Sequence, residues 1–169
     1  MRIPSWFLLL AVVALAPCVA AKDKNEQFKT VEAKHFSQAE GVELTPAFSD
    51  YFYAELREEL KKAKLAHEVI GEGEAVDDAD APDSAIIVGT ITEYKKGNVA
   101  KAVLIGFTAG WQSLKMDADV QRRSDQHNLC TTIHVHTRID PRWNEKMMAK
   151  VAAREVVKGM KNGLKQQPQ

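Results

Sequence analysis

The chain lacks an excess of either charge, because its 23 lysines and arginines balance 23 aspartates and glutamates. We therefore expect no nucleic-acid partner, since such binding depends on a basic surface that neutralises phosphates. The chain also lacks the low apolar content of a disordered protein, because 45% of its 169 residues are hydrophobic. A chain of this length can bury a core without help from metals or disulfides.

Long hydrophobic runs are also missing, since no stretch reaches the roughly 18 to 20 residues of a transmembrane helix. The longest clear apolar run, Trp6 to Leu15, follows a short basic start and precedes the small residues Val19 and Ala21. This pattern is typical of an export signal. We predict a signal peptide over 1–21, a single globular domain over 22–169, and a periplasmic or secreted protein after cleavage near Ala21.

Cysteine is scarce, with only Cys18 and Cys130 in the chain. Cleavage after Ala21 would leave Cys130 alone and exclude an intramolecular disulfide. The alternative is a lipid anchor, because Leu15-Ala16-Pro17-Cys18 resembles a bacterial lipobox. In that case Cys18 would be the lipidated first residue of a membrane-anchored lipoprotein, although Pro17 replaces the small residue usual at its position.

Two amphipathic helices are expected. Thr45-Pro46 is a favourable helix start, and apolar residues then recur at steps of three or four up to about Leu65. A second helix is predicted from about Arg142 to Leu164. Its predicted apolar stripe consists of Trp143, Met147, Val151, Val156, Met160 and Leu164, and Ala152 and Ala153 are expected to allow close approach of a neighbouring element.

The remaining periodic segments indicate strands. Residues 85–94 are apolar or β-branched almost throughout, which is typical of a central strand covered on both faces. Residues 111–122 and 129–139 alternate and are joined by a polar turn, which predicts an antiparallel hairpin. A first strand is expected within 28–36, and the acidic segment 71–83 is expected to be a solvated loop. The fold class is therefore α/β (α+β), with a single small, largely antiparallel sheet and two main helices packed on it.

The region around 97–110 carries a family resemblance. Gly97-Asn98 follows the central strand, then come Lys101 and the turn Gly106-Phe107-Thr108-Ala109-Gly110. This order resembles the bacterial family 4410 of the domains of unknown function, with Lys101 and Thr108 as departures from its pattern. The resemblance implies an exported envelope protein, often a lipoprotein, without assigned activity or catalytic residues.

A metal site is one candidate for chemistry. Cys130, His134 and His136 have the same parity in one predicted strand, so their side chains are expected on one face. A thiolate and two imidazoles can bind zinc or copper. The competing interpretation is that this is the polar face of a half-exposed strand, with no cofactor bound.

Catalysis has little support in the sequence. No nucleophile elbow, phosphate-binding loop or metalloprotease motif occurs. Cys130 has only histidines of the same strand as candidate bases, and residues two places apart in a strand are too distant for a direct hydrogen bond. We therefore expect a protein that is not an enzyme.

The segment 99–110 is the main candidate for function, because it is too apolar for an idle surface loop. It is expected either to complete the core as a crossover or short helix, or to expose an apolar patch that meets a partner subunit or the membrane. The candidate partner-binding residues are Val103, Leu104, Phe107 and Lys101. The predicted function is a non-enzymatic binding or accessory module that contacts another envelope component, as a protein partner or a second copy of the chain.

Overall fold

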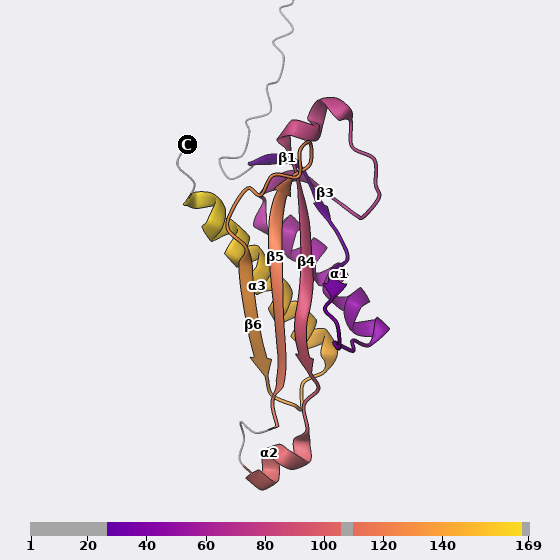
Figure 1. The fold of residues 1–169 in the computed structure, drawn as a ribbon, viewed down its shortest axis with the longest axis vertical. Helices are drawn as coiled ribbons and strands as arrows, with labels where there is room; N and C mark the ends of the chain where they lie inside the picture. The colour runs from indigo at the N-terminus through magenta and orange to yellow at the C-terminus, as the bar shows by residue number, and fades with distance from the viewer. Residues whose placement is uncertain (1–26, 106–109, 167–169) are drawn as a thin grey trace, which may run out of the picture.

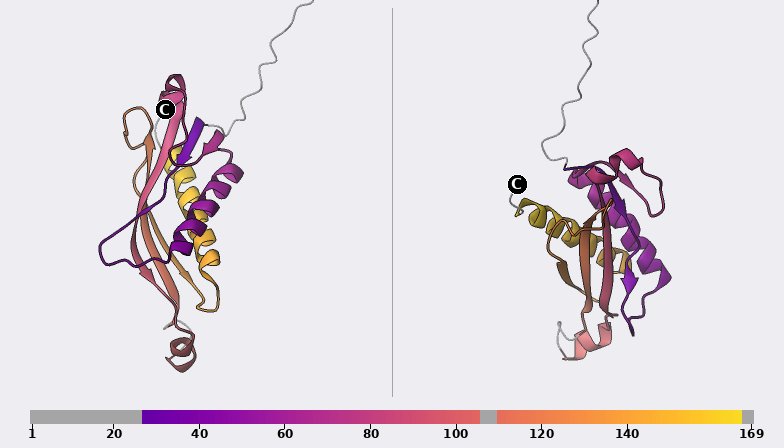
Figure 2. Two further views of the ribbon diagram at one scale, coloured as in Figure 1. Left: turned by 90° about the vertical axis from the view of Figure 1, so that its right-hand side faces the viewer. Right: turned by 45° about the horizontal axis from the view of Figure 1, so that its top comes forward.

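A computed structural model describes residues 27–105 and 110–166. Its centre is a six-stranded mixed sheet, in which five strands follow the order β3-β1-β4-β5-β6 and β2 pairs with β4. Two long helices, α1 and α3, lie against one face of this sheet (Figures 1 and 2). The predicted class, a single small sheet with two main helices, is confirmed.

Half of the sheet is parallel. Strand β1 (Phe28–Ala33) lies between β3 (Ala66–Ile70) and β4 (Ser84–Lys95) and runs parallel to both. The short β2 (Ser37–Gln38) extends the edge of β4 beyond β1. Helix α1 connects β1 to its parallel neighbour β3, since a parallel pair needs a crossover connection.

The other half is antiparallel. Strand β5 (Gln112–Arg122) pairs with β4 along nearly its whole length and with β6 (Ile133–Ile139) on its other edge. The predicted hairpin of two alternating strands is therefore present. The alternation places Leu114, Met116 and Val135 in the core, while Lys115 and His136 are exposed on the opposite face.

Helix α1 (Pro46–Ala63) confirms the expected helix start, because the backbone N–H of Phe48 donates to Thr45 Oγ1 at 3.1 Å. Its apolar residues occur at the spacing that keeps them on one helix face. They are all buried: Phe48, Phe52, Leu56, Leu60 and Ala63.

Helix α3 (Glu145–Lys165) corrects the predicted apolar stripe. Trp143 precedes the helix, which is capped by Asn144, and its side chain is 50% exposed. Met147 is also exposed. Val156 and Met160 of the predicted stripe are buried, and Ala152 and Ala153 are buried with them, where small side chains permit close packing between helices. The buried residues are Met148, Ala149, Ala152, Ala153, Val156, Val157 and Met160.

The acidic segment 71–83 is mostly exposed, as predicted, and ends in a short 3-10 helix, η1 (Asp78–Asp83). Asp80 forms an ion pair with Lys29 at the edge of β1. Near this end of the sheet Glu32 is buried, accepts a hydrogen bond from the Gly73 N–H and pairs with Arg123. These contacts hold the loop against the end of the sheet where β4 begins.

The chain leaves the opposite end of the sheet as a short helix, α2 (Val99–Ile105), between β4 and β5. This helix projects beyond the strands, away from η1 (Figure 1). None of the helices in the described residues has both the length and the apolar character needed to span a membrane.

Gly89 provides a test of the packing between the sheet and α1. A Cβ at this position would lie 2.2 Å from Cε2 of Phe36 and 2.6 Å from the carbonyl oxygen of Asp117. We expect Gly89→Ala to lower the free energy of unfolding by about 1–3 kcal/mol, because the core must shift to admit the methyl group. Urea denaturation measures this loss. The exposed neighbour Thr92→Ala should change stability by no more than about 0.5 kcal/mol, and equal stability of the two variants would contradict the packing described here.

Candidate functional site

The candidate site is built on the segment of residues 96–111 that connects β4 to β5, which we call the excursion. The Asn98 N–H donates to the Gly110 carbonyl at 2.9 Å, which closes the base of the excursion. Asn98 Oδ1 in turn accepts from the Lys101 N–H at 3.0 Å and so caps the start of α2. A Cβ on Gly97 would lie 2.6 Å from Gln112 Cγ and 2.7 Å from Pro141 Cβ, so glycine permits the close approach here.

Helix α2 is exposed although it is apolar. The side chains of Val103, Leu104 and Ile105 are 75%, 82% and 73% exposed. The helix contacts no other helix or strand within the part of the chain that the structure describes. For the described residues Val99–Ile105, the interpretation as a buried part of the core is therefore wrong, and an exposed apolar patch is found.

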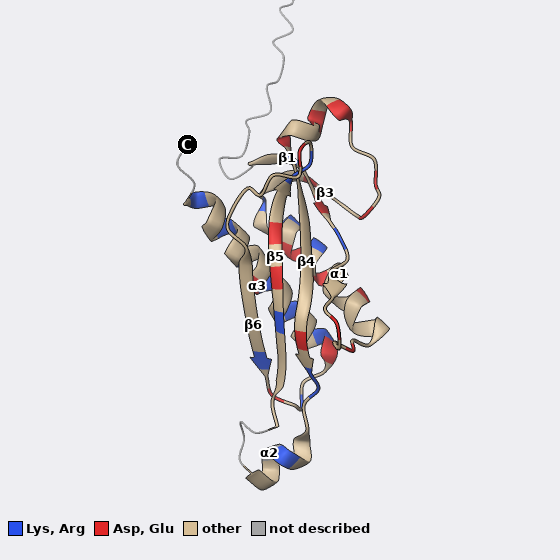
Figure 3. Ribbon diagram, in the orientation of Figure 1, with Lys and Arg blue, Asp and Glu red and all other residues tan. Residues whose placement is uncertain are grey.

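The charged residues of the chain segment that carries α2, residues 95–111, are all lysines. Lys101 is the only charged residue of α2 itself (Figure 3). Lys95 pairs with Glu93 at 3.0 Å, whereas Lys96 and Lys101 form no ion pair with any residue in the described ranges. Beside them, the Arg138 guanidinium lies over the Trp111 ring at 5.8 Å from its centroid. The exposed apolar helix is therefore flanked by cations.

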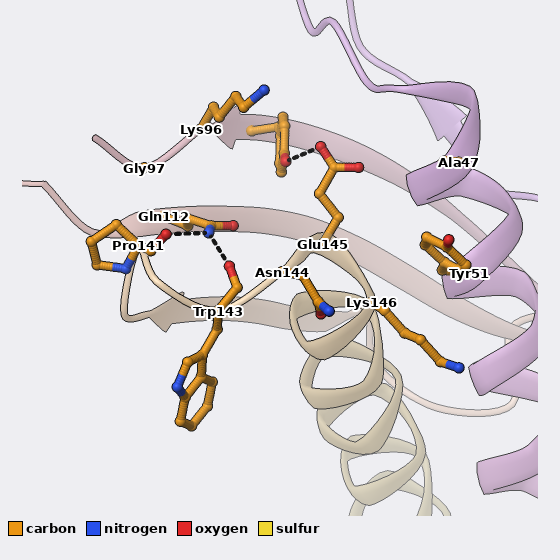
Figure 4. A pocket seen from close by; sticks show the side chains of 11 residues that line it. Ala47, Tyr51, Lys96, Gly97, Gln112, Pro141, Trp143, Asn144, Glu145 and Lys146 are labelled. Atoms are coloured by element: carbon orange, nitrogen blue, oxygen red, sulfur yellow. Dashed lines mark hydrogen bonds between the residues drawn. The ribbon is translucent and has the colours of Figure 1, made fainter. Parts of the chain in front are cut away.

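An open pocket of about 480 Å³ lies next to the base of the excursion, between the N-terminal ends of α1 and α3 (Figure 4). The exposed aromatic residues Tyr51 and Trp143 and the cationic Lys96 and Lys146 belong to its lining. The remaining lining residues are Ala47, Tyr94, Gly97, Gln112, Pro141, Asn144 and Glu145.

Glu145 is the central charge of this pocket. Its carboxylate accepts hydrogen bonds from Thr45 Oγ1 at 2.7 Å and from the Tyr94 hydroxyl at 3.3 Å. It therefore sits where the first turns of α1 and α3 meet, a position that favours an anion. Burial, followed by the negative charge of Glu145 and its hydrogen bond, raises the pKa of Tyr94 to about 12. Because both oxygens of Glu145 have internal partners, the carboxylate joins α1, β4 and α3.

Gln112 fixes the other wall of the pocket. Its side chain is buried, and Nε2 donates to the carbonyl oxygens of Trp143 at 2.6 Å and Pro141 at 3.4 Å. These bonds tie the start of β5 to the connection between β6 and α3 (Figure 4). Its Oε1 has no hydrogen-bond partner among the described residues, and it is shielded from solvent.

The predicted metal site is not assembled as expected. His134 and His136 are exposed on the outer face of β6, but Cys130 is buried on the helix side, where a Cβ on Gly163 would lie 2.9 Å from the Cys130 Cβ. The shared face predicted for the three residues is wrong, because β6 begins only at Ile133 and the chain before it is irregular. Across residues 27–105 and 110–166, no three His, Cys, Asp or Glu side chains are grouped to hold a metal.

The environments of these residues do not activate a nucleophile. Burial raises the pKa of the Cys130 thiol, which lowers the fraction of reactive thiolate. His134 Nδ1 lies 2.6 Å from Asp117 Oδ1, but Cys130 is on the other face of the sheet from this pair. The arrangement therefore gives no specific support to a Cys130 nucleophile.

Of the predicted partner-binding residues, Lys101, Val103 and Leu104 lie together on α2, while Phe107 falls outside the described residues. The signal peptide and the lipidation candidate Cys18 also fall outside them. Tyr94, Gln112 and Glu145 are not among the site residues predicted from the sequence. A single sequence carries no signal for their contacts, since Glu145 meets partners 51 and 100 positions earlier in the chain.

The family model described as domain of unknown function DUF4410 matches residues 19–156. No curated protein matches the chain. Similar solved structures include two PelC dodecamers from Paraburkholderia phytofirmans. One has 10% sequence identity and a TM-score of 0.58 and covers 80% of this chain and 90% of PelC. The other has 11% identity and a TM-score of 0.57 and covers 79% and 88%.

A third similar structure is a Xanthomonas campestris protein described with family model DUF330. It has 9% identity and a TM-score of 0.52 and covers 84% of this chain and 86% of its own. At such low identities the three structures establish a shared fold alone.

The pairing of Tyr94 with Glu145 predicts a pH dependence of stability. The raised pKa means that the folded protein keeps the Tyr94 proton above pH 10, where the unfolded chain loses it. The free energy of unfolding should therefore fall as pH rises from about 10 towards 12, and Tyr94→Phe should reduce this slope. Urea unfolding over that pH range measures it. Tyr51→Phe, at the exposed rim of the same pocket, should keep the wild-type slope, and equal slopes for wild type and Tyr94→Phe would refute the prediction.

Proposed function

The chain belongs to the family of domain of unknown function DUF4410, and on this premise we propose that it is an exported, non-enzymatic accessory module of the bacterial envelope. The module acts by binding another envelope component through α2. The single observation that carries the proposal is the exposure of an apolar helix that touches no other element of the described chain. Exposed contiguous apolar surface on a folded protein usually marks an interaction site.

The architecture of the excursion supports this assignment. Its base is fixed by the Asn98–Gly110 hydrogen bond and by the close approach of Gly97 to Gln112 and Pro141. These contacts hold the base in place, so α2, the tip of the excursion, extends from a fixed position, and this limits the entropy lost when a partner binds. A binding role for Lys101, Val103 and Leu104 follows from their place on this tip.

A non-enzymatic role is supported by the state of the candidate catalytic groups. The Cys130 thiol is buried with a raised pKa, and both oxygens of Glu145 accept internal hydrogen bonds. Neither environment resembles the paired, accessible groups of an activated nucleophile.

Export and assembly are further parts of the proposal. The apolar run ending near Leu15 and the small residues up to Ala21 support a cleaved signal peptide and a periplasmic or secreted domain over 22–169. A lipid anchor on Cys18 is the alternative. The description of the PelC structures as dodecamers, together with the shared fold, supports self-association of this chain.

Site-specific photocrosslinking tests the binding role. A photoreactive residue in place of Leu104 should give light-dependent adducts with an envelope component in intact cells, because this side chain is 82% exposed on the tip. The same residue in place of Glu155, exposed on α3, is the matched control and should give far less adduct. Equal labelling at the two positions, or none at Leu104, would refute a binding role of α2.

Native mass spectrometry of the protein isolated from the envelope tests export and assembly together. We expect chains that begin at Lys22 and assemblies of several copies. A mass that fits a lipidated chain beginning at Cys18 would instead show that the protein is membrane-anchored and is not cleaved after Ala21. An intact Met1 start would refute export by either route, and a single copy at all concentrations would refute self-association.

A further inference from the structure

The composition of α2 makes its exposure unusual. All of its residues except Lys101 are apolar, so the sequence is apolar around nearly the whole helix. A helix of this kind is normally buried in a core or in lipid. Here the side chains at positions 103–105, each at least 73% exposed, cover no part of the sheet or of the long helices. An apolar medium outside the described chain is needed to cover them.

The size of the tip favours a lipid surface over a protein surface. Seven residues form a helix about 10 Å long. A stable protein interface uses about 20 to 30 residues from each partner, which is far more than α2 offers. Shallow insertion at the boundary between headgroups and acyl chains needs only about 5–10 Å of apolar depth. The dimensions of α2 match this depth.

The charges around the tip select the kind of lipid. From Lys95 to Trp111 the chain has three lysines and no aspartate or glutamate. Lys101 lies on the helix itself and Lys96 just before it, and neither is neutralised by an ion pair within the described residues. Arg138 adds a further exposed cation near the end of β6, at this end of the sheet, and the acidic Asp140 just beyond it is paired with Arg142. Cations around an apolar insertion are complementary to anionic headgroups.

Trp111 is also suited to the surface of a membrane. It is 37% exposed, immediately precedes β5, and its ring lies against the Arg138 guanidinium. Tryptophan is enriched at membrane interfaces, where its apolar ring and its N–H group lie between lipid and water. From the outside inwards, this end of the molecule therefore presents the apolar helix with Lys101. Next come Lys96, Arg138 and the Trp111 ring, and then the sheet.

We infer that α2 docks the protein onto an anionic lipid surface, with Val103, Leu104 and Ile105 inserted below the headgroups and Lys96, Lys101 and Arg138 facing them. This inference rests on the proposed function and names the envelope component that α2 contacts. Docking of this kind is reversible, because the inserted area is small and the electrostatic attraction is screened by salt.

Vesicle cosedimentation with the whole protein tests the inference. Vesicles of phosphatidylcholine mixed with phosphatidylglycerol should bind the protein, whereas phosphatidylcholine alone should bind it at least about fivefold more weakly. Two variants separate the contributions. Lys101→Glu should weaken binding to the anionic vesicles roughly tenfold, and Val103→Asn with Leu104→Asn should weaken it by a similar factor or more.

The controls address folding and position. Met147→Ser removes an exposed apolar side chain from α3 and should bind the vesicles like wild type. The α2 variants should keep the wild-type melting temperature, because α2 packs against no described helix or strand. Raising the salt concentration should release the protein from anionic vesicles.

Each contrary result has a defined meaning. Equal binding to neutral and anionic vesicles would overturn the inferred attraction between the lysines and anionic headgroups. If the α2 variants bind vesicles like wild type, any lipid contact lies elsewhere on the protein. No vesicle binding would overturn the inference as a whole. The Leu104 crosslinker then separates the two proposals: an adduct with a protein, including a second copy of the chain, would leave the binding function standing without the lipid. Absence of any adduct would remove both.

Discussion

Strand β4 is the constraint on which the rest of the structure depends. Its one edge pairs first with β1 and then with β2, and its other edge carries β5 along most of its twelve residues. The segment between these two parallel partners carries Phe36, whose buried ring lies against Phe52 of α1. The ring fits because position 89 has no side chain. A single missing side chain in the central strand therefore sets how closely α1 approaches the sheet.

The elements with clear periodicity could be predicted from the sequence. The apolar residues of α1, spaced by three or four, and the alternation in β5 and β6 each reflect a large difference in burial between two faces. Strand β3 was missed, because only five residues form it and just one of them, Ile70, is buried. The apolar face of α3 was predicted only in part. Val156, Met160, Ala152 and Ala153 are buried as expected, whereas Trp143 precedes the helix and Met147 is exposed. The local spacing does not show which apolar residues the rest of the fold covers.

The candidate site could also be predicted only in part. The apolar character of 99–105 is visible in the sequence, but its exposure depends on which elements surround it, and the local pattern fits both a buried and an exposed helix. The contacts of Glu145 depend on the meeting of two helix starts and one strand, which only the tertiary fold determines. The residues behind the family resemblance have a structural explanation: Gly97, Asn98 and Gly110 close the base of the excursion.

The directions of the strands also define two poles of the molecule. Strand β1 runs parallel to β4 and begins beside its first residues, so Phe28 lies at the pole opposite α2. Twelve strand residues at about 3.3 Å each separate these poles by about 40 Å. A chain held at its N-terminal pole would carry α2 at that standoff, pointing away from the point of attachment. If the chain is anchored at this pole and α2 binds as inferred, the sheet would separate the two contacts by its own length, whereas a released chain would keep the α2 contact alone.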